Sequence, residues 1–174
     1  MKSYINPRIS IKIIMSEITD QIYVGSYGDA ASEQFLSDRR ITHIITCADE
    51  FPSSFLRSGY KIPIVDDVAD AKTKKYFLEA ASVLDRWVKE DKKIMVHCFA
   101  GMSRSVSVVV TYFMMYKGWS FDLAYGHLKQ RRIQSNIHSA FIPILKEIEL
   151  TRPPLEGRYL QHQGQQGSQA QQLH

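Results

Sequence analysis

A cysteine and an arginine six positions apart, Cys98 and Arg104, could together carry out phosphoryl transfer. A cysteine attacks phosphorus as a thiolate, so its pKa has to fall below the free value of about 8.5. An arginine presents a planar fork that binds two phosphate oxygens at once and follows them as the phosphoryl group flattens in the transition state. Residues 96–105, Val-His-Cys-Phe-Ala-Gly-Met-Ser-Arg-Ser, therefore predict a phosphate site with a nucleophile at its floor.

The apolar runs on either side of this stretch predict a strand before it and a helix after it. In such a unit the N–H groups of the loop and the helix N-terminus converge on one point, where they stabilise both a dianion and a thiolate. Gly101 lets the loop turn, and Ser105 can donate a hydrogen bond to the Cys98 sulfur when sulfur is the leaving group. His97 is expected to orient the loop rather than to act as a base. The other loop residues are Phe99, Ala100, Met102 and Ser103.

The alternative is a buried structural cysteine that precedes an arginine by chance, but the spacing of five residue types in this context favours the catalytic interpretation. At these residues the chain resembles the cysteine-dependent protein phosphatases, in particular small atypical members of the dual-specificity branch with a single catalytic domain. The resemblance covers about residues 16–150 and is carried further by Ile18–Gly25, Arg40–Ala48, Tyr60–Asp66 and Leu128–Arg132. It implies an α/β fold of the protein tyrosine phosphatase type, with a central, mostly parallel sheet flanked by helices. It also implies ester hydrolysis through a phosphocysteine intermediate, with no cofactor and no metal.

An alcohol leaving group needs a proton, which a carboxylic acid near the loop can donate. Against the family pattern, counting from Ile62 places this general acid at Asp66, whereas counting back from Phe77 places it at Asp67, because the intervening loop is one residue longer than usual. We favour Asp66, because a strand sets its position and insertions accumulate in the loop that follows. The other carboxylate is expected to be a solvated turn residue, and Asp70 is a weaker candidate.

Lys129, Arg131 and Arg132 form a basic cluster at the end of a predicted helix. Cations at this end complement the helix dipole, which is the simpler interpretation. The resemblance adds a second contact to a phosphoprotein substrate as an alternative. His138 stands where the family usually has an asparagine that supports the loop backbone, so the resemblance does not predict how this loop is braced.

Cys47, the only other cysteine, ends the predicted strand His43–Cys47. In a parallel sheet with its active site at the carboxyl ends of the strands, this thiol emerges beside the strand that carries Cys98. The context resembles that of the phosphatase-and-tensin homologue, whose cysteine there can pair with the catalytic one and so trap an oxidised thiolate as a disulfide. The simpler interpretation is a small buried residue that fills the sheet face.

Alternating strand and helix patterns indicate a sheet with helices on both faces. The predicted strands are Ile22–Val24, His43–Cys47, Lys61–Val65 and 93–96, and the predicted helices are Asp29–Arg39, 72–90, Ser103–Tyr116 (ended by Gly118), 120–131 and 139–150. Residues 1–15 contain alternating isoleucines, which suggest either an extra edge strand or an extension before an internal start at Met15 instead of Met1. Trp87 and Trp119 are expected to be core and anchor residues.

The length of 174 residues predicts one domain with a sizeable core. We expect an N-terminal extension over 1–15, a catalytic domain over 16–152 and a disordered Gln- and Gly-rich tail over 153–174. The net charge of +4 suits phosphorylated partners but is too small to indicate nucleic-acid binding. No apolar run is long enough for a membrane span, and no secretion signal is recognisable. Because Cys98 has to stay reduced, a cytoplasmic or nuclear setting is expected.

The leading hypothesis is a signalling phosphatase that dephosphorylates phosphotyrosine, and also phosphoserine or phosphothreonine, on proteins such as kinases. A first alternative is a phosphoinositide or RNA 5′-phosphate phosphatase on the same scaffold. Family members that act on inositol lipids carry lysines in the loop, where this chain has Phe99 and Met102. A second alternative is a non-catalytic phosphoprotein-binding module. Such relatives lose the nucleophile or the arginine, and this chain keeps both Cys98 and Arg104.

Overall fold

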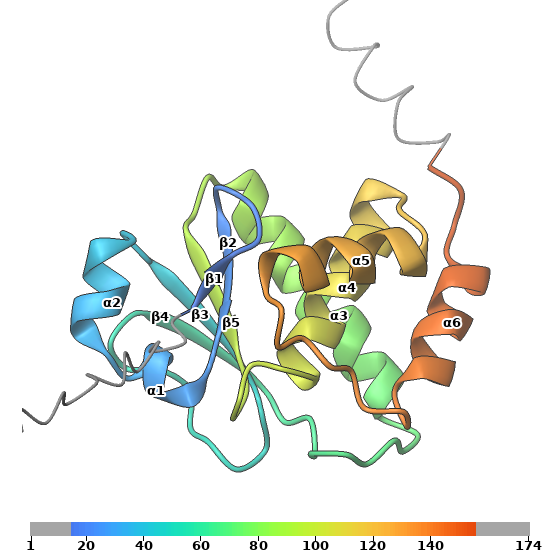
Figure 1. The fold of residues 1–174 in the computed structure, drawn as a ribbon, viewed down its shortest axis with the longest axis horizontal. Coiled ribbons are helices and arrows are strands. Elements are labelled where there is room, and N and C mark those ends of the chain that lie inside the picture. Colours follow the sequence, from blue (N-terminus) through green and yellow to red (C-terminus); the bar gives the residue numbers. More distant parts are fainter. Residues whose placement is uncertain (1–14, 156–174) are drawn as a thin grey trace, which may run out of the picture.

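The computed structural model describes residues 15–155, so the predictions for 1–14 and 156–174 lie outside the described residues. The described chain forms a five-stranded sheet in the order β1-β2-β5-β3-β4 (Figure 1). Its strands are β1 (Ser16–Glu17), β2 (Ile22–Gly25), β3 (His43–Cys47), β4 (Ser58–Ile62) and β5 (Ile94–His97). The short β1 is antiparallel to β2, and all other pairs are parallel, which confirms the predicted mostly parallel sheet.

Helices cover both faces of this sheet, as predicted, but unequally (Figure 1). They are α1 (Tyr27–Ala30), α2 (Glu33–Asp38), α3 (Thr73–Lys89), α4 (Arg104–Lys117), α5 (Phe121–Arg131) and α6 (Ile142–Thr151). The pair α1 and α2 closes a small apolar cluster on one face, and the other four helices close the larger cluster on the opposite face. Residues 104–114 of α4 are all buried, because this helix lies between the sheet and the outer helices. An apolar sequence such as Val-Ser-Val-Val-Val is stable there since every side of the helix is covered.

The central strand β5 directs its carboxyl end to the middle of one sheet edge. All four of its residues are buried, and it pairs with β2 and β3 in parallel. In this register His97 lies opposite Gly25 on one side and Thr46 on the other. The loop that begins at Cys98 therefore emerges between the segments that follow β2 and β3, and these segments contribute to the same site.

Three elements differ from the sequence predictions. The predicted strand Lys61–Val65 is found at Ser58–Ile62, because Pro63 has no N–H group with which to continue the ladder. The predicted helix Asp29–Arg39 is two short helices, because Ser26 and Ser32 each cap a separate helix through a side-chain oxygen. The two-residue strand β1 was not predicted. The remaining helices and strands begin and end within three residues of their predicted limits.

Trp87 is buried on α3, and Trp119 stacks on Phe113 with ring centroids 4.5 Å apart, so both have the predicted packing roles. Gly118 ends α4 in the left-handed conformation with φ of 72°, as expected of a helix C-terminus. Within residues 15–155, no helix has both the length and the apolar character that crossing a membrane requires.

Candidate active site

Residues 98–103, which we call the phosphate loop, connect β5 to α4 and pack tightly against the end of β2. Gly101 has φ of 67°, and a Cβ atom there would lie 2.4 Å from the carbonyl oxygen of Gly25. A larger residue at position 101 would therefore both strain the backbone and push the loop away from β2. The N–H group of Tyr27 donates to the Phe99 carbonyl at 2.9 Å, which ties the loop to the start of α1 as well.

The buried Arg132 braces the phosphate loop from the other side. Its Nε donates to the Gly101 carbonyl at 2.7 Å, and its Nη2 donates to the Ala100 carbonyl at 3.3 Å. The N–H of Asn136 donates to the Met102 carbonyl at 2.9 Å. In a trans peptide the N–H group points away from the carbonyl, so carbonyls held on the outside turn the loop N–H groups inwards. The brace thus favours a loop whose N–H groups can receive an anion.

These contacts correct the sequence interpretation for Arg132 only, since Lys129 and Arg131 do lie in the last turn of α5. Arg132 is only 2% exposed, so it neither lies at the surface to meet a substrate nor serves mainly to complement the helix dipole. Arg131 is exposed, and the Lys129 ammonium group lies over the Tyr125 ring. At position 138, where an asparagine was the family expectation, the bracing group is the backbone: the His138 N–H donates to Ser103 Oγ at 2.9 Å.

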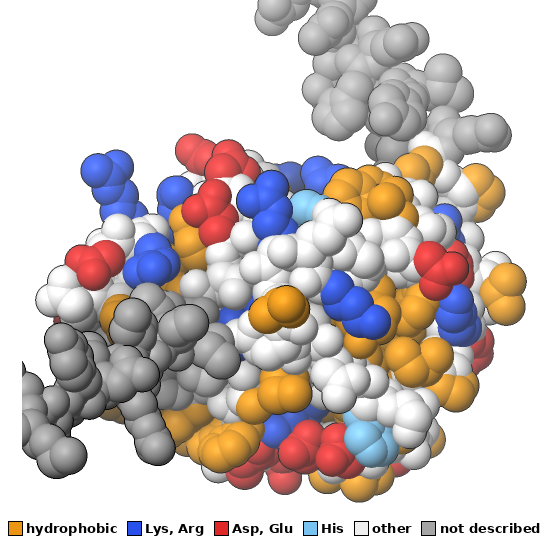
Figure 2. All heavy atoms as spheres, viewed as in Figure 1, with side chains coloured by type: hydrophobic (Ala, Val, Ile, Leu, Met, Phe, Trp, Pro, Cys, Tyr) orange, Lys and Arg blue, Asp and Glu red, His pale blue; other side chains and the backbone are white. Residues whose placement is uncertain are grey.

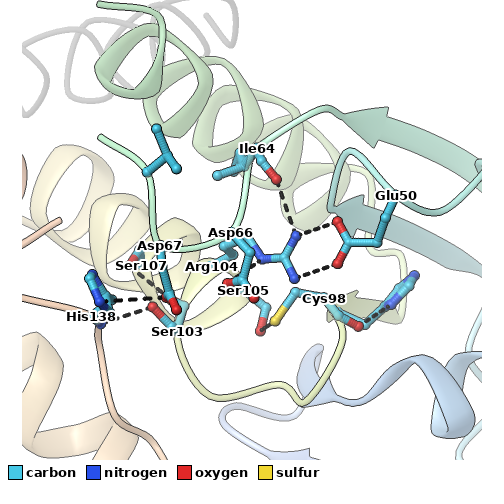
Figure 3. A network of polar contacts seen from close by, with 12 residues as sticks. Glu50, Ile64, Asp66, Asp67, Cys98, Ser103, Arg104, Ser105, Ser107 and His138 are labelled. Carbon is cyan, nitrogen blue, oxygen red and sulfur yellow. Dashed lines mark hydrogen bonds and ion pairs between the residues drawn. The ribbon is translucent and has the colours of Figure 1, made fainter. Parts of the chain in front are cut away.

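Cys98 lies at the floor of the pocket, with 3% of its surface exposed. Its Sγ is 3.3 Å from Ser105 Oγ, so the expected hydroxyl partner is in place (Figure 3). His97 contacts the Cys98 carbonyl oxygen through Nδ1 at 3.0 Å and the Thr46 hydroxyl through Nε2 at 2.9 Å. Because the carbonyl can only accept, Nδ1 carries the proton, and burial lowers the pKa of His97. His97 is thus a neutral hydrogen-bonding residue beneath the loop, as predicted.

The guanidinium group of Arg104 is buried and held along one edge (Figure 3). Its Nη1 and Nη2 each donate to the Glu50 carboxylate at 2.6 Å, and Nη1 also donates to the Ile64 carbonyl at 3.2 Å. These hydrogen bonds lower the pKa of Glu50. Nε lies 3.3 Å from Asp66 Oδ1 and makes no hydrogen bond with any described residue. The edge formed by Nε and Nη2 is therefore the one that can receive two phosphate oxygens.

The two candidate acids point in different directions, although each side chain is 57% exposed. Asp66 turns towards the Arg104 guanidinium, whereas Asp67 Oδ1 lies 3.9 Å from His138 Nε2 (Figure 3). Asp67 has φ of 54°, which accounts for the change of direction between neighbours. Asp70 accepts hydrogen bonds from the N–H groups of Lys72 and Thr73 at the start of α3. Asp70 thus binds N–H groups at the start of α3 and is not among the residues that line the pocket.

The pocket above Cys98 has a volume of about 260 Å³ and combines a cation, two acids and the loop. Its lining residues are Asp66, Asp67, Cys98, Phe99, Ala100, Met102, Ser103, Arg104, Asn136 and His138. Sequence reasoning missed Glu50, which holds Arg104, and Thr46, which holds His97. The signal for Glu50 was its position just beyond β3, at the same sheet edge as Cys98.

Cys47 is fully buried beside Cys98. Continuing the pairing of Thr46 with His97 by one residue places Cys47 opposite Cys98. The side chains of Thr46 and His97 meet on one sheet face, so strand alternation directs both cysteines to the other face, where they belong to one apolar cluster. Burial raises the pKa of the Cys47 thiol, so it is neutral in the reduced protein.

Comparisons with known proteins agree with this geometry. Residues 22–150 match the family model "Dual specificity phosphatase, catalytic domain". Dual specificity protein phosphatase 1B of Arabidopsis thaliana is 34% identical over 139 residues, which cover 78% of this chain and 81% of that protein. MAP kinase phosphatase with leucine-rich repeats protein 1 of Dictyostelium discoideum is 31% identical over 137 residues, covering 79% of this chain and 16% of that protein.

Solved structures share this fold. The crystal structure of DUSP15 is similar with a TM-score of 0.70 and 27% sequence identity, covering 80% of this chain and 89% of that one. The crystal structure of human DUSP28 is similar with a TM-score of 0.71 and 20% sequence identity, covering 78% of this chain and 92% of that one. At this identity the similarity supports the fold alone. The chain therefore belongs to the dual specificity phosphatase family and is a protein phosphatase that acts through a phosphocysteine intermediate.

Proposed function

We propose that Cys98 is the nucleophile of this phosphatase, that Arg104 binds the transferred phosphoryl group and that Asp66 is the general acid. The observation that carries this assignment is the Nε of the buried Arg104, which makes no hydrogen bond with any described residue and faces Asp66 in the pocket whose floor is Cys98. With two phosphate oxygens on the Nε edge and the third on loop N–H groups, Cys98 Sγ can approach phosphorus opposite the leaving oxygen. A P–S bond forms as the P–O bond breaks.

Asp66 is better placed than Asp67 to protonate the leaving oxygen. Its Oδ1 lies 3.3 Å from Arg104 Nε, close to where the phosphoryl group binds, whereas Asp67 is directed to His138. A bound phosphate takes over the Nε edge and displaces Asp66 from it. Asp66 then lies beside the leaving oxygen, to which it donates a proton.

Ser105 acts in the second step, when water attacks the phosphocysteine and sulfur leaves as a thiolate. Its hydroxyl, 3.3 Å from Sγ, can donate a hydrogen bond to the developing charge. Asp66, deprotonated after the first step, takes a proton from the attacking water. This step forms inorganic phosphate, which is released. It also restores the cysteine thiolate and the protonated acid for a new cycle.

The proposed substrates are phosphotyrosine, phosphoserine and phosphothreonine residues of signalling proteins, kinases among them, in the cytoplasm or nucleus. One relative is named as a MAP kinase phosphatase, which supports a kinase as substrate. Phe99 and Met102 line the pocket in place of loop lysines, and Asp66 and Asp67 add negative charge to it. Both features disfavour the polyanionic inositol phosphates. The limits of the catalytic domain at residues 16 and 152 are part of this proposal.

The test begins with phosphate release from para-nitrophenyl phosphate, followed by a panel of phosphopeptides, inositol phosphates and RNA bearing a 5′-phosphate. We expect the phosphopeptides to give the highest kcat/KM. Cys98→Ser should bind a phosphopeptide but turn it over at less than about 1% of the wild-type rate, because a hydroxyl is not ionised. Acid quenching of wild-type enzyme during turnover should trap phosphate on Cys98. Appreciable turnover by the serine variant would rule out this nucleophile.

A further inference from the structure

A group of four aromatic side chains extends from the catalytic pocket to a second pocket, and we call it the aromatic strip: Phe99, Phe51, Tyr27 and Phe55. The Tyr27 and Phe51 rings stack with centroids 4.1 Å apart and planes 8° apart, and Phe51 and Phe99 continue the stack at 6.0 Å and 9°. Tyr27 is 42% exposed, Phe99 63% and Phe55 90%. Large apolar side chains that gather at a surface in this way mark interaction sites.

The aromatic strip connects the catalytic pocket with a second pocket of about 170 Å³. Phe99 lines the catalytic pocket, and Tyr27 and Phe55 line the second one. The remaining lining residues of the second pocket are Ala30, Ala31, Pro52, Ser53, Ser54, Leu56 and His97. The Tyr27 N–H bonded to the Phe99 carbonyl holds the two pockets in a fixed relation. Figure 2 shows hydrophobic side chains next to acidic ones along the lower edge of the molecule, where Figure 1 places α1 and the end of β5.

We propose that the aromatic strip and the second pocket form a subsite for an apolar side chain of the phosphoprotein substrate, about three residues from the phosphorylated one. The inference rests on the proposed function, because it needs a peptide whose phosphoresidue occupies the catalytic pocket. The ring centroid of Phe99 is 6.0 Å from that of Phe51, which in turn is 4.1 Å from that of Tyr27. Extended chain covers this span with about three residues at roughly 3.3 Å each.

The charges around the catalytic pocket favour a peptide over a lipid surface as the occupant. Asp66 and Asp67 are each 57% exposed, and both line the catalytic pocket. Membranes that contain phosphoinositides carry negative charge, which these carboxylates repel. A phosphopeptide brings one dianion to Arg104 and can place a neutral apolar side chain on the aromatic strip.

The test compares kcat/KM for phosphotyrosine peptides that differ in a single residue. Leucine or phenylalanine replaces serine at each position from three before to three after the phosphotyrosine. We expect one position, two or three residues away, at which the apolar residue raises kcat/KM by about tenfold, as is usual for an apolar side chain entering a matching pocket. The effect should be in KM, since the subsite does not touch the reacting atoms.

Phe55→Ser is the informative variant, because Phe55 is almost fully exposed and its loss removes little packing from the fold. It should reduce the tenfold preference to less than about threefold and leave hydrolysis of para-nitrophenyl phosphate unchanged. Leu150→Ser is the matched control, since Leu150 is 85% exposed on α6, across the molecule from α1. It should leave the preference intact.

Three results would overturn the inference. The first is a kcat/KM that does not depend on apolar residues beside the phosphotyrosine. The second is a preference for apolar residues that Phe55→Ser and Leu150→Ser change equally. The third is that presenting a phosphoinositide in vesicles raises its rate of hydrolysis by a larger factor than an added apolar residue raises that of a peptide, which would assign the aromatic strip to a membrane surface. Hydrolysis of para-nitrophenyl phosphate without hydrolysis of any phosphopeptide would instead reject the proposed function itself.

Discussion

Glu50 and Arg104 are 54 residues apart in the chain and form a pair with two hydrogen bonds of 2.6 Å. The pair holds the guanidinium group along its Nη edge, inside the protein, and so fixes the direction of the Nε edge towards the pocket. An arginine that is already oriented binds phosphate without first losing side-chain entropy. Glu50 is therefore a positioning residue that acts through Arg104.

Replacing Glu50 by glutamine should weaken phosphate binding, because an amide cannot accept both charge-assisted hydrogen bonds. We expect kcat/KM to fall by about 10- to 100-fold, matching the loss of about 1.5–3 kcal/mol typical of such bonds. Binding of a phosphopeptide to the Cys98→Ser protein should weaken when Glu50→Gln is added. Glu33→Gln is the control, since Glu33 makes a similar pair with Arg57 away from the pocket. If Glu50→Gln and Glu33→Gln lower kcat/KM equally, Glu50 does not act by positioning Arg104.

Asp66→Asn should slow hydrolysis of a phosphotyrosine substrate by about 100-fold, because its leaving group needs a proton. An acidic phenol leaves readily without one, so para-nitrophenyl phosphate should be affected much less. Asp67→Asn serves as the neighbouring control with the same exposure. If this pattern occurs in Asp67→Asn and not in Asp66→Asn, the acid is Asp67.

Arg132→Met should both destabilise the protein and impair catalysis. The Gly101 and Ala100 carbonyls lose their partner, which costs about 1–3 kcal/mol for a buried polar group. The midpoint of thermal unfolding should fall by several degrees, and kcat should fall because the loop N–H groups are no longer held inwards. Arg131→Met, the exposed neighbour, should change neither property. A loss confined to peptide substrates in Arg131→Met would indicate a substrate contact by Arg131.

Mild peroxide should inactivate the enzyme reversibly through a Cys47–Cys98 disulfide. Neighbouring parallel strands lie about 4.8 Å apart, and a disulfide forms when the Cα atoms are within about 7 Å. Peptide mapping of the oxidised protein should find the cross-linked pair. Cys47→Ser should recover less activity than wild type after thiol is added, because its sulfenic acid proceeds to irreversible states. Equal recovery would mean that Cys47 only fills the core.

Stability should decrease as the pH falls from 7 to 5, in part because His97 is buried in its neutral form. Burial lowers the pKa of His97, so protons bind the unfolded chain more tightly. The stabilisation from neutral His97 is fully present above the pKa of histidine in the unfolded chain, about 6.5. It is lost as the pH falls from there through the lower pKa of His97 in the folded protein. The free energy of unfolding, measured with urea, should depend less on pH in His97→Asn than in the wild type. The difference in slope should be up to about 1.4 kcal/mol per pH unit. Parallel curves for wild type and variant would show that His97 does not titrate on unfolding.

The aromatic strip and the loop brace could not be read from the sequence, although each consists of ordinary side chains. Arg132 is 31 residues from Gly101, and its neighbour Arg131 has the same charge. Only the docking of the segment after α5 against the phosphate loop decides which of the two is buried. Likewise, Tyr27 and Phe51 meet because the segments after β2 and β3 flank the same strand.

Local spacing by itself determined the strand–loop–helix unit, and it predicted the nucleophile, the arginine and the hydroxyl partner that we propose within it. Those residues lie within eight positions, and one tight turn is enough to bring them together. The apolar periodicity of the sequence also determined the long helices. It did not determine the limits of β4, where a proline ends the strand, or the division of α1 from α2, where two serines cap separate helices. The choice of Glu50 as partner of Arg104, and the different directions of Asp66 and Asp67, depended on the tertiary structure. Contacts between distant segments follow from the strand order, and neither residue spacing nor local propensity encodes that order.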